Sequence, residues 1–296
     1  MNVLIAGGSG FLGSEVAKSL LARKHYVTIL TRRAPGRPNQ IQWDGYTTNG
    51  WGHLVNEMDA VVNLTGYGLD HGPWTKRRKQ KFVDSRVLPA LALVSAFEKA
   101  SRRPSVFLQA SGINRYGFRG EGNADESFPP ANDFLGQLTV QWENATQPIE
   151  ELGVRRVVIR SAVVLARRGG LFPLMALPVR LFFGGRFGGG SQAMNWIHIA
   201  DYVNSVCFLL ENDKARGPYN LISPEPTTNA DFMREIARVL RRPYWFHIPS
   251  FLLKMTMGEM SILLTEGRFA QPKRLLESGF MFQFGTLEDA MNNLLA

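Results

Sequence analysis

A glycine-rich loop near the start of the chain restricts the possible folds more than any other feature. The apolar run Asn2–Ala6 leads into Gly7-Gly8-Ser9-Gly10-Phe11-Leu12-Gly13, which contains the pattern G-x-x-G-x-x-G. Apolar residues at helical spacing then continue over Phe11–Arg23. In dinucleotide-binding units, glycines between a strand and a helix allow a tight turn, close approach of a pyrophosphate and close helix packing. A turn without a ligand is the alternative, but the flanking strand and helix favour a dinucleotide site formed by Gly7, Gly10, Phe11, Leu12 and Gly13.

The first half of the chain alternates short apolar runs with helical patterns. We expect strands at Asn2–Ala6, Tyr26–Thr31, Gln40–Trp43, Ala60–Leu64, Val106–Ala110 and Arg156–Ile159. We expect helices at Phe11–Arg23, Arg78–Ala100 and Phe134–Leu152. Strands that alternate with helices favour a parallel sheet with right-handed crossovers. The predicted fold class is therefore α/β, with a doubly wound parallel sheet of the Rossmann type.

The second half has a different character. Glycines are frequent between residues 166 and 191, and helical patterns follow at Ile199–Glu211, Asn229–Leu240, Phe251–Leu264 and Leu287–Leu294. We predict a dinucleotide-binding domain over residues 1–165 and a smaller, mostly helical substrate-binding lobe over residues 166–296. The two parts are expected to pack closely, to share the sheet and to enclose a substrate cleft.

The end of the second predicted strand bears on the choice of cofactor. NAD-binding units usually place Asp or Glu about 20 residues after the glycines, where it binds the ribose 2′-hydroxyl. Here that place holds Thr31-Arg32-Arg33, and no acidic residue lies between Glu15 and Asp44. Guanidinium groups pair well with a phosphate, so the sequence predicts NADP(H). The alternative is that both arginines are solvated loop residues.

The chain is basic, with 34 Lys and Arg residues against 25 Asp and Glu residues and a formal net charge of +9. Most of the excess lies in scattered pairs, namely Arg32-Arg33, Arg77-Arg78, Arg102-Arg103, Arg155-Arg156, Arg167-Arg168 and Arg241-Arg242. Scattered basic pairs are typical of a soluble protein surface, whereas a nucleic-acid-binding groove usually gathers its basic residues on one element. The dense run Lys76–Lys81 leaves RNA binding as a minor alternative, although a solvated helix start explains it as well.

The sequence also bears on the cellular location and the binding partners of the protein. Cys207 is the single cysteine, which excludes an intramolecular disulfide framework. The N-terminal segment does not resemble a signal peptide, and the apolar stretch 171–183 is interrupted by Pro173, Pro178 and Arg180. We expect a cytoplasmic protein without a membrane segment, a monomer or homodimer that acts on a small-molecule substrate.

Ordered landmarks continue along the whole chain. They are GGSGFLG at 7–13, NLTG at 63–66, Trp74, Lys79, Asp84-Ser85-Arg86, Ser111, Tyr116-Gly117, Trp142-Glu143, RSAVVL at 160–165, Gly169-Gly170, Gly184-Gly185, WIHIAD at 196–201 and Gly279-Phe280. In these residues the chain resembles the extended short-chain dehydrogenase/reductases, and within them the atypical group called the epimerase family. The resemblance implies a Rossmann-type fold, a nicotinamide cofactor and a cleft between two lobes. It also implies that Leu64, Thr65 and Gly66 line the adenine and ribose side of the cofactor.

The catalytic pattern departs from that of the superfamily. Its typical members use a Tyr-x-x-x-Lys pair, but none of the 7 tyrosines here is followed four residues later by lysine. Counting back from Glu143 places Leu135 and Thr139 where the pair would lie. Ser111 at a strand end and Tyr116 remain as candidate catalytic residues, with a turn serine and a packed core aromatic as the alternatives.

Three further polar residues are weaker candidates. Lys79 and Arg86 lie seven residues apart on one face of a predicted helix, from which they could reach the cleft. His198 belongs to an H-x-x-D sequence, but no metal-binding spacing accompanies it, so a structural histidine is favoured.

Two functions follow from these residues. The first is an NADP(H)-dependent oxidoreductase or epimerase that acts on a small polar substrate. The second, prompted by the missing pair, is an NADP(H)-binding regulatory or partner-binding protein without turnover.

Overall fold

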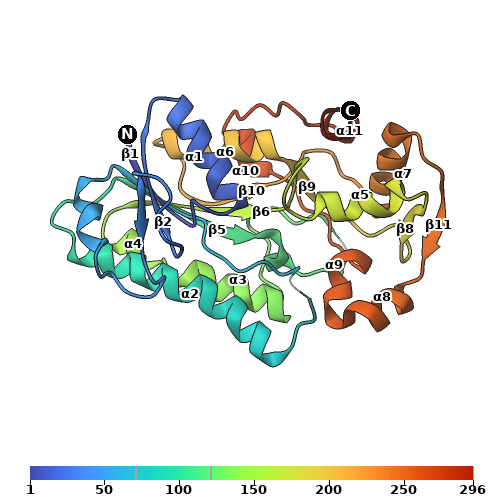
Figure 1. Ribbon diagram of the computed structural model, residues 1–296, viewed down its shortest axis with the longest axis horizontal. Coiled ribbons are helices and arrows are strands. Elements are labelled where there is room, and N and C mark those ends of the chain that lie inside the picture. The colour runs from blue at the N-terminus through green and yellow to red at the C-terminus, as the bar shows by residue number, and fades with distance from the viewer. Residues whose placement is uncertain (71, 121, 296) are drawn as a thin grey trace.

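The central element is a seven-stranded parallel sheet with strand order β10-β6-β5-β4-β1-β2-β3 (Figure 1). The structure is a computed structural model that describes residues 1–70, 72–120 and 122–295. The strands are β1 (Asn2–Ala6), β2 (Tyr26–Thr31), β3 (Gln40–Gln42), β4 (Ala60–Asn63), β5 (Val106–Gly112), β6 (Arg155–Ser161) and β10 (Gly217–Leu221). This topology confirms the predicted Rossmann-like α/β fold.

Helices cover both faces of the sheet (Figure 1). One face carries α2 (Lys76–Lys99), α3 (Phe134–Asn144), α4 (Pro148–Glu151) and the 3-10 turn η1 (Gly52–Glu57). The other carries α1 (Phe11–Ala22), α6 (Ile199–Glu211) and α10 (Lys273–Glu277). Strand β1 shows how the layers form, because Val3 and Ile5 belong to the core beneath α1 and α6, whereas Leu4 and Ala6 belong to the core beneath α2. This alternation follows from the two-residue period of a strand.

Apart from the 3-10 turn η2 (Ile113–Tyr116), which follows β5, the remaining elements form a smaller body at the carboxyl side of the sheet, on the right in Figure 1. They are β7 (Val163–Leu165), α5 (Phe172–Arg180), β8 (Gly184–Phe187), β9 (Trp196–His198), α7 (Asn229–Leu240), β11 (Tyr244–Ile248), α8 (Ser250–Met257), η3 (Gly258–Ser261), α9 (Ile262–Thr265) and α11 (Leu287–Leu295). Two short parallel strand pairs, β7 with β9 and β8 with β11, accompany the helices. Their own hydrophobic core includes Phe172, Phe232 and Met291.

Several elements differ from the expectation. The single helix predicted over Phe134–Leu152 is divided into α3 and α4, because Pro148 has no N–H to continue the bonds of α3 and instead begins a new helix. Strand β10 was not predicted, since Gly217 and Pro218 are poor strand residues. It nevertheless pairs with β6 along Val157–Ser161, so a segment from the second half of the chain completes the central sheet.

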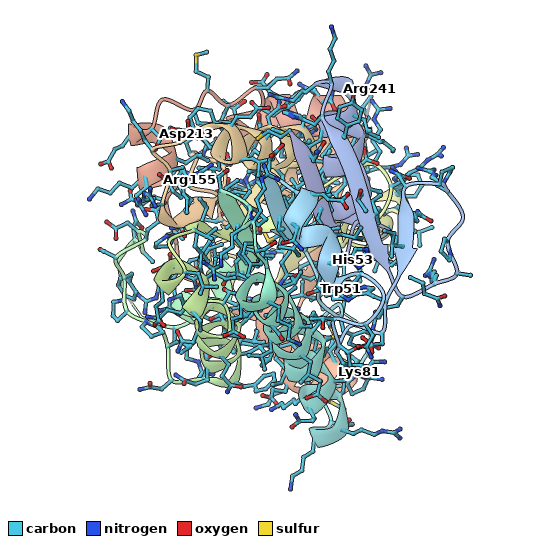
Figure 2. The ribbon with its side chains drawn as sticks, turned by 90° about the vertical axis from the view of Figure 1, so that its left-hand side faces the viewer. Trp51, His53, Lys81, Arg155, Asp213 and Arg241 are labelled. Carbon is cyan, nitrogen blue, oxygen red and sulfur yellow. The ribbon has the colours of Figure 1, made fainter. Side chains whose placement is uncertain are left out.

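One of the basic pairs is not a surface pair. Arg155 and Arg156 are only 7% and 8% exposed, so the assignment of this pair to general solubility was wrong. Arg155 donates to the carbonyl oxygens of Leu209, Leu210 and Ala215, where α6 ends (Figure 2). A cation there satisfies carbonyl groups that the helix leaves free and complements its dipole.

No helix among the described residues is both long enough and apolar enough to span a membrane.

Candidate cofactor and active site

A cavity of about 710 Å³ opens at the carboxyl ends of β1, β2 and β4. In doubly wound sheets this edge is where ligands bind. Eight of the predicted cofactor-binding residues line it, namely Gly7, Gly10, Thr31, Arg32, Arg33, Leu64, Thr65 and Gly66. We call this space the nucleotide cavity.

The glycines of the loop are required by close backbone contacts. A Cβ on Gly13 would lie 2.3 Å from the carbonyl oxygen of Gly7, so only glycine lets α1 begin so close to β1. Gly7 has φ +82°, and a Cβ there would lie 2.8 Å from the backbone of Leu64. Gly10 caps α1 without a side-chain hydrogen bond, which leaves N–H groups of the first turn available to an anion. The loop therefore has the geometry of a phosphate cradle.

Cations meet in the nucleotide cavity from two elements. Arg32 and Arg33 follow β2, while Arg77 and Lys81 come from the first turns of α2 (Lys81 is labelled in Figure 2). Thr31 supports the turn after β2, because its hydroxyl accepts from the N–H of Arg33 and lies 3.1 Å from the hydroxyl of Ser9. The arrangement suits an additional phosphate beyond the pyrophosphate.

Sequence reasoning missed Arg77 and Lys81, which it treated as part of a solvated run. It also missed Trp43, Asp44 and Tyr46, which follow β3 and line the same cavity. Asp44 accepts hydrogen bonds from the N–H groups of Tyr46 and Thr47 and from the Thr47 hydroxyl. These bonds, led by that of the Thr47 N–H, lower the pKa of Asp44. Its charge therefore holds a turn in place beside the arginines.

A second cavity, of about 260 Å³, adjoins the first and shares Leu64, Thr65 and Gly66 with it. We call it the inner cavity. Its wall includes Leu12, Ser111, Leu135, Thr139 and Trp142. Leu135 and Thr139, which the count back from Glu143 assigns to the positions of the tyrosine and lysine, both line this cavity. The inner cavity shares Leu69, Asn114 and Ser161 with a further cavity of about 270 Å³ that reaches into the smaller body.

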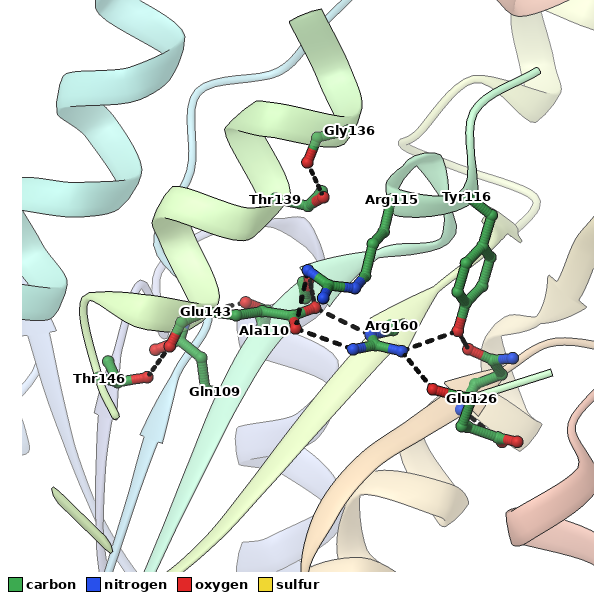
Figure 3. A network of polar contacts seen from close by, with 12 residues as sticks. Gln109, Ala110, Arg115, Tyr116, Glu126, Gly136, Thr139, Glu143, Thr146 and Arg160 are labelled. Carbon is green, nitrogen blue, oxygen red and sulfur yellow. Dashed lines mark hydrogen bonds and ion pairs between the residues drawn. The ribbon is translucent and has the colours of Figure 1, made fainter. Parts of the chain in front are cut away.

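Ser111 is fixed by the buried ion pair of Glu143 with Arg160, the two residues labelled near the centre of Figure 3. Its hydroxyl donates to Glu143 Oε1 at 2.7 Å, and Arg160 donates to both carboxylate oxygens of Glu143 at 2.9 Å. Burial raises the pKa of Glu143, but the bonds and charges of Arg160, Ser111 and Arg115 outweigh it and leave that pKa below its usual range. Glu143 is therefore an ionised anchor and a poor proton acceptor.

The pairing of Glu143 with Arg160 was not anticipated. One signal could have indicated it, since Glu143 lies on a helix face otherwise formed by apolar residues such as Leu135, Leu138 and Trp142. A carboxylate on the buried face of a helix requires a cation or several donors.

Tyr116 lines neither the nucleotide cavity nor the inner cavity. It is 2% exposed, and its hydroxyl donates to Asn220 at 2.6 Å and accepts from Arg160 at 3.0 Å. Burial raises its pKa, and the charge of Arg160 offsets this only in part. The structure therefore brings Ser111 to the inner cavity and places Tyr116 on the far side of Arg160.

Three residues of the predicted cofactor set, Phe11, Leu12 and Gly13, do not line the nucleotide cavity. The ring of Phe11 packs against Gly169 and Gly170. A Cβ on Gly169 would lie only 2.6 Å from that ring. Gly13 is buried and acts through its lack of a side chain. Leu12 faces the inner cavity.

His198 has structural contacts. Its Nδ1 accepts from the N–H of Ala200 at the start of α6, its Nε2 lies 3.2 Å from Asn293, and its ring lies 3.9 Å from that of Phe284. Burial lowers its pKa to about 4. Asp201 accepts the N–H groups of Gln283 and Phe284. Within the described residues no group of three or more His, Cys, Asp or Glu side chains could hold a metal ion.

Two family models and a relative of known sequence match this chain. Residues 3–221 match the family model described as the NAD dependent epimerase/dehydratase family, and residues 248–294 match a domain of unknown function, DUF1731. The epimerase family protein YfhF of Bacillus subtilis (strain 168) is 35% identical over 303 residues, which cover 100% of this chain and 98% of that protein.

Solved structures give the same result. The human epimerase family protein SDR39U1, solved with NADPH, has a TM-score of 0.91 at 32% identity, with 99% of both chains covered. The UDP-glucose 4-epimerase of Thermus thermophilus, solved with NAD, shares the fold, with a TM-score of 0.77 at 19% identity and coverage of 99% of this chain and 97% of that chain. These matches confirm the family expected from the landmarks in the sequence. The chain belongs to the NAD dependent epimerase/dehydratase family.

Proposed function

We propose that this protein binds NADP(H) and acts as an oxidoreductase or epimerase on a small polar substrate. The observation that carries the proposal is the nucleotide cavity, in which a glycine cradle lies beside Arg32, Arg33, Arg77 and Lys81. A 2′-phosphate adds about −2 in charge beside these cations, whereas the ribose hydroxyl of NAD(H) gives them nothing to pair with. NADPH in the human relative supports the same choice.

Residues of the nucleotide cavity and of the inner cavity could hold different parts of a nicotinamide cofactor. The first turn of α1 and Gly10 would hold the pyrophosphate, and Leu64–Gly66 would hold the adenosine and ribose side through their backbone. When bound, the nicotinamide supplies the acceptor or donor of a hydride. Leu12, Leu135 and Leu138 in the wall of the inner cavity keep water from that reaction.

Ser111 is the side chain that we assign to the substrate. Its hydroxyl proton points to Glu143, so its oxygen presents lone pairs that can accept a hydrogen bond from a substrate hydroxyl. Rotation of the hydroxyl away from Glu143 would instead let it donate to a substrate carbonyl. We assign Tyr116 the role of a positioning residue that holds Arg160, and through it Glu143 and Ser111.

A second function has its own support. Leu135 and Thr139 in the cavity wall provide neither a phenol nor an amine, and the Thr139 hydroxyl is bonded to the carbonyl oxygen of Gly136. A protein that binds NADP(H) without turnover would need no proton-transfer pair. It would act as a redox-sensing regulator or a partner-binding module.

One set of measurements separates the two functions. Fluorescence titration should give a dissociation constant for NADPH at least tenfold below that for NADH, and tighter binding of NADH would refute the cofactor proposal. Steady-state oxidation of NADPH is then followed over a panel of carbonyl compounds, and inversion of configuration is followed over a panel of sugar nucleotides, because an epimerase regenerates its cofactor and causes no net oxidation of NADPH. Turnover that is lost in Ser111→Ala with NADPH affinity intact supports the enzyme. Tight NADPH binding without turnover on any panel member supports the regulator.

A further inference from the structure

Arg86 of α2 is a buried guanidinium without a carboxylate partner among the described residues. The residue is 9% exposed. Its Nη1 donates to the carbonyl oxygens of Tyr67 at 3.0 Å and Phe82 at 3.2 Å, and lies 3.5 Å from the hydroxyl of Ser85. Burial lowers its pKa to about 10, so it stays charged at neutral pH. All of its partners are neutral, and its positive charge is therefore not compensated.

The position of this charge is informative. Arg86 lines the inner cavity, and among the described residues of that wall it is the one with a charged side chain. Its guanidinium lies 5.0 Å from the ring of Trp142 and packs against Gly66. Within the described residues, its Nε and Nη2 have no hydrogen-bond partner, and they lie on the side of Gly66, which belongs to both cavities.

Arg86 also stands beside the helix face from which the usual lysine would project. Thr139 occupies the lysine position, and Trp142, which touches Arg86, lies one turn further along α3. The indole N–H of Trp142 is buried and also lacks a partner within the described part of the chain. The inner cavity thus combines the cation of Arg86 with the hydroxyl of Ser111.

A buried cation without a counter-ion is costly, and in a low-dielectric site it attracts an anion strongly. The phosphates of a dinucleotide have their own partners in the nucleotide cavity, namely the glycine loop, Arg32 and Arg33. We propose that Arg86 binds an oxyanion group of the substrate, so that the substrate is a small hydroxy or oxo compound that carries a carboxylate or phosphate. Arg86 holds the anionic group, and Ser111 contacts the neighbouring hydroxyl or carbonyl oxygen. This inference rests on the proposed function, since it names the substrate class of that same site.

The test measures anion binding and does not depend on turnover. Protein saturated with NADPH is titrated with sodium acetate or inorganic phosphate at constant ionic strength, with sodium chloride as the balancing salt, and its melting temperature is followed. A ligand that binds the folded state alone raises the melting temperature in a saturable way. We expect such a rise with at least one of the two probes, and the stronger probe distinguishes a carboxylate substrate from a phosphate one.

Variants assign the effect to Arg86. Arg86→Gln should weaken probe binding at least tenfold and leave NADPH affinity within threefold, whereas Arg86→Lys should retain part of the probe binding. The matched control is Arg78→Gln, because Arg78 lies on the same helix and also donates to a backbone carbonyl, that of Pro73, but lines neither cavity. It should respond as the wild type does.

Three results would overturn the proposal. They are the absence of a saturable rise in the wild type, an equal rise in Arg86→Gln, and displacement of NADPH by the probes, which would show that Arg86 pairs with the cofactor. If Arg86→Gln does not fold, the wild-type titration and Arg86→Lys decide. If NADPH does not bind at all, the proposed function fails, and the same titration of the protein without NADPH still tests the anion site.

Discussion

Ser111 donates its hydroxyl proton to Glu143 at 2.7 Å, and this bond connects the inner cavity to the buried ion pair of Glu143 with Arg160. The serine is the next-to-last residue of β5. Arg160 lies on the neighbouring strand β6, and Glu143 comes from α3 (Figure 3). Three elements of the sheet domain are thereby locked together beneath the candidate active site. The orientation of the Ser111 oxygen depends on charges that line neither the nucleotide cavity nor the inner cavity.

Replacement of Glu143 by Gln should destabilise the fold strongly. The amide keeps the shape of the side chain and an acceptor for Ser111, but it leaves the charge of Arg160 buried and unpaired. Loss of one partner of a buried pair typically costs about 3–5 kcal/mol. Urea denaturation of Glu143→Gln should show a decrease of that order in the free energy of unfolding.

The control for this variant is Glu15→Gln, which breaks the exposed pair of Glu15 with Lys18. Surface pairs contribute less than about 1 kcal/mol. Equal stability losses in the two variants would mean that the Glu143–Arg160 pair contributes no more than a surface pair.

Tyr116→Phe distinguishes a positioning role from a catalytic one. Removal of the hydroxyl leaves the side-chain oxygen of Asn220 and one N–H of Arg160 without this partner in a buried site. We expect a loss of about 1–3 kcal/mol in unfolding free energy and an unchanged dissociation constant for NADPH. Unchanged stability with a large fall in turnover would instead show that the hydroxyl takes part in the reaction.

Much of the nucleotide cavity could be predicted because its residues directly follow strands. The glycine loop follows β1, Arg32 and Arg33 follow β2, and Leu64–Gly66 follow β4. In a parallel sheet the carboxyl ends of adjacent strands meet at one edge, so local sequence is enough to bring such residues together. The apolar runs of β1, β2 and β4 are themselves clear signals of buried strands.

The contributions of α2 and the smaller body could not be predicted in the same way. Arg77 and Lys81 reach the nucleotide cavity only because the start of α2 passes over the edge of the sheet, which depends on tertiary packing. Strand β10 joins the sheet although Gly217 and Pro218 are poor strand residues, since pairing with β6 outweighs local preference. In the sequence, Arg86 is one of several cations on a basic helix, and only the structure shows that its side chain is buried.

Arg32→Ala should change cofactor preference without changing the fold. Arg32 is exposed and lines the nucleotide cavity, so its removal costs little stability. A charge-assisted bond to phosphate contributes about 1.5–3 kcal/mol, which corresponds to a weakening of NADPH binding by roughly 10- to 100-fold. Binding of NADH should change less than threefold. An equal loss for both cofactors in a calorimetric titration would contradict the assignment of Arg32 to the 2′-phosphate.

Gly13→Ala tests the close contact between α1 and the loop. The new Cβ would lie 2.3 Å from the carbonyl oxygen of Gly7, and since that atom belongs to the backbone, α1 must shift away. We expect NADPH binding to weaken at least 100-fold, measured by fluorescence titration. Gly36→Ala is the control, because the nearest atom to its Cβ, on Gln40, lies 3.8 Å away. Comparable affinities for the two variants would show that the loop tolerates a wider turn.

Protonation of His198 should make the free energy of unfolding depend on pH, in a range where few other side chains titrate. Its folded pKa of about 4 lies below the value of 6.5 expected for the unfolded chain, so the unfolded state binds the proton more readily. The stabilising contribution is therefore present above pH 6.5 and is lost as the pH falls toward 4. By linkage, about 2 kcal/mol of unfolding free energy should disappear between pH 8 and pH 5.

The variant His198→Asn isolates this contribution. Asparagine can still accept a hydrogen bond at the start of α6, but it does not titrate. Burial raises the pKa of the neighbouring Asp201, which gives a slope of opposite sign, but that slope is common to both proteins and cancels in their difference. Urea denaturation at pH 8, 6.5 and 5 should show the wild type losing stability relative to His198→Asn as the pH falls. Parallel losses in the two proteins would mean that His198 is protonated in the folded state despite its burial against Phe284 and Asn293.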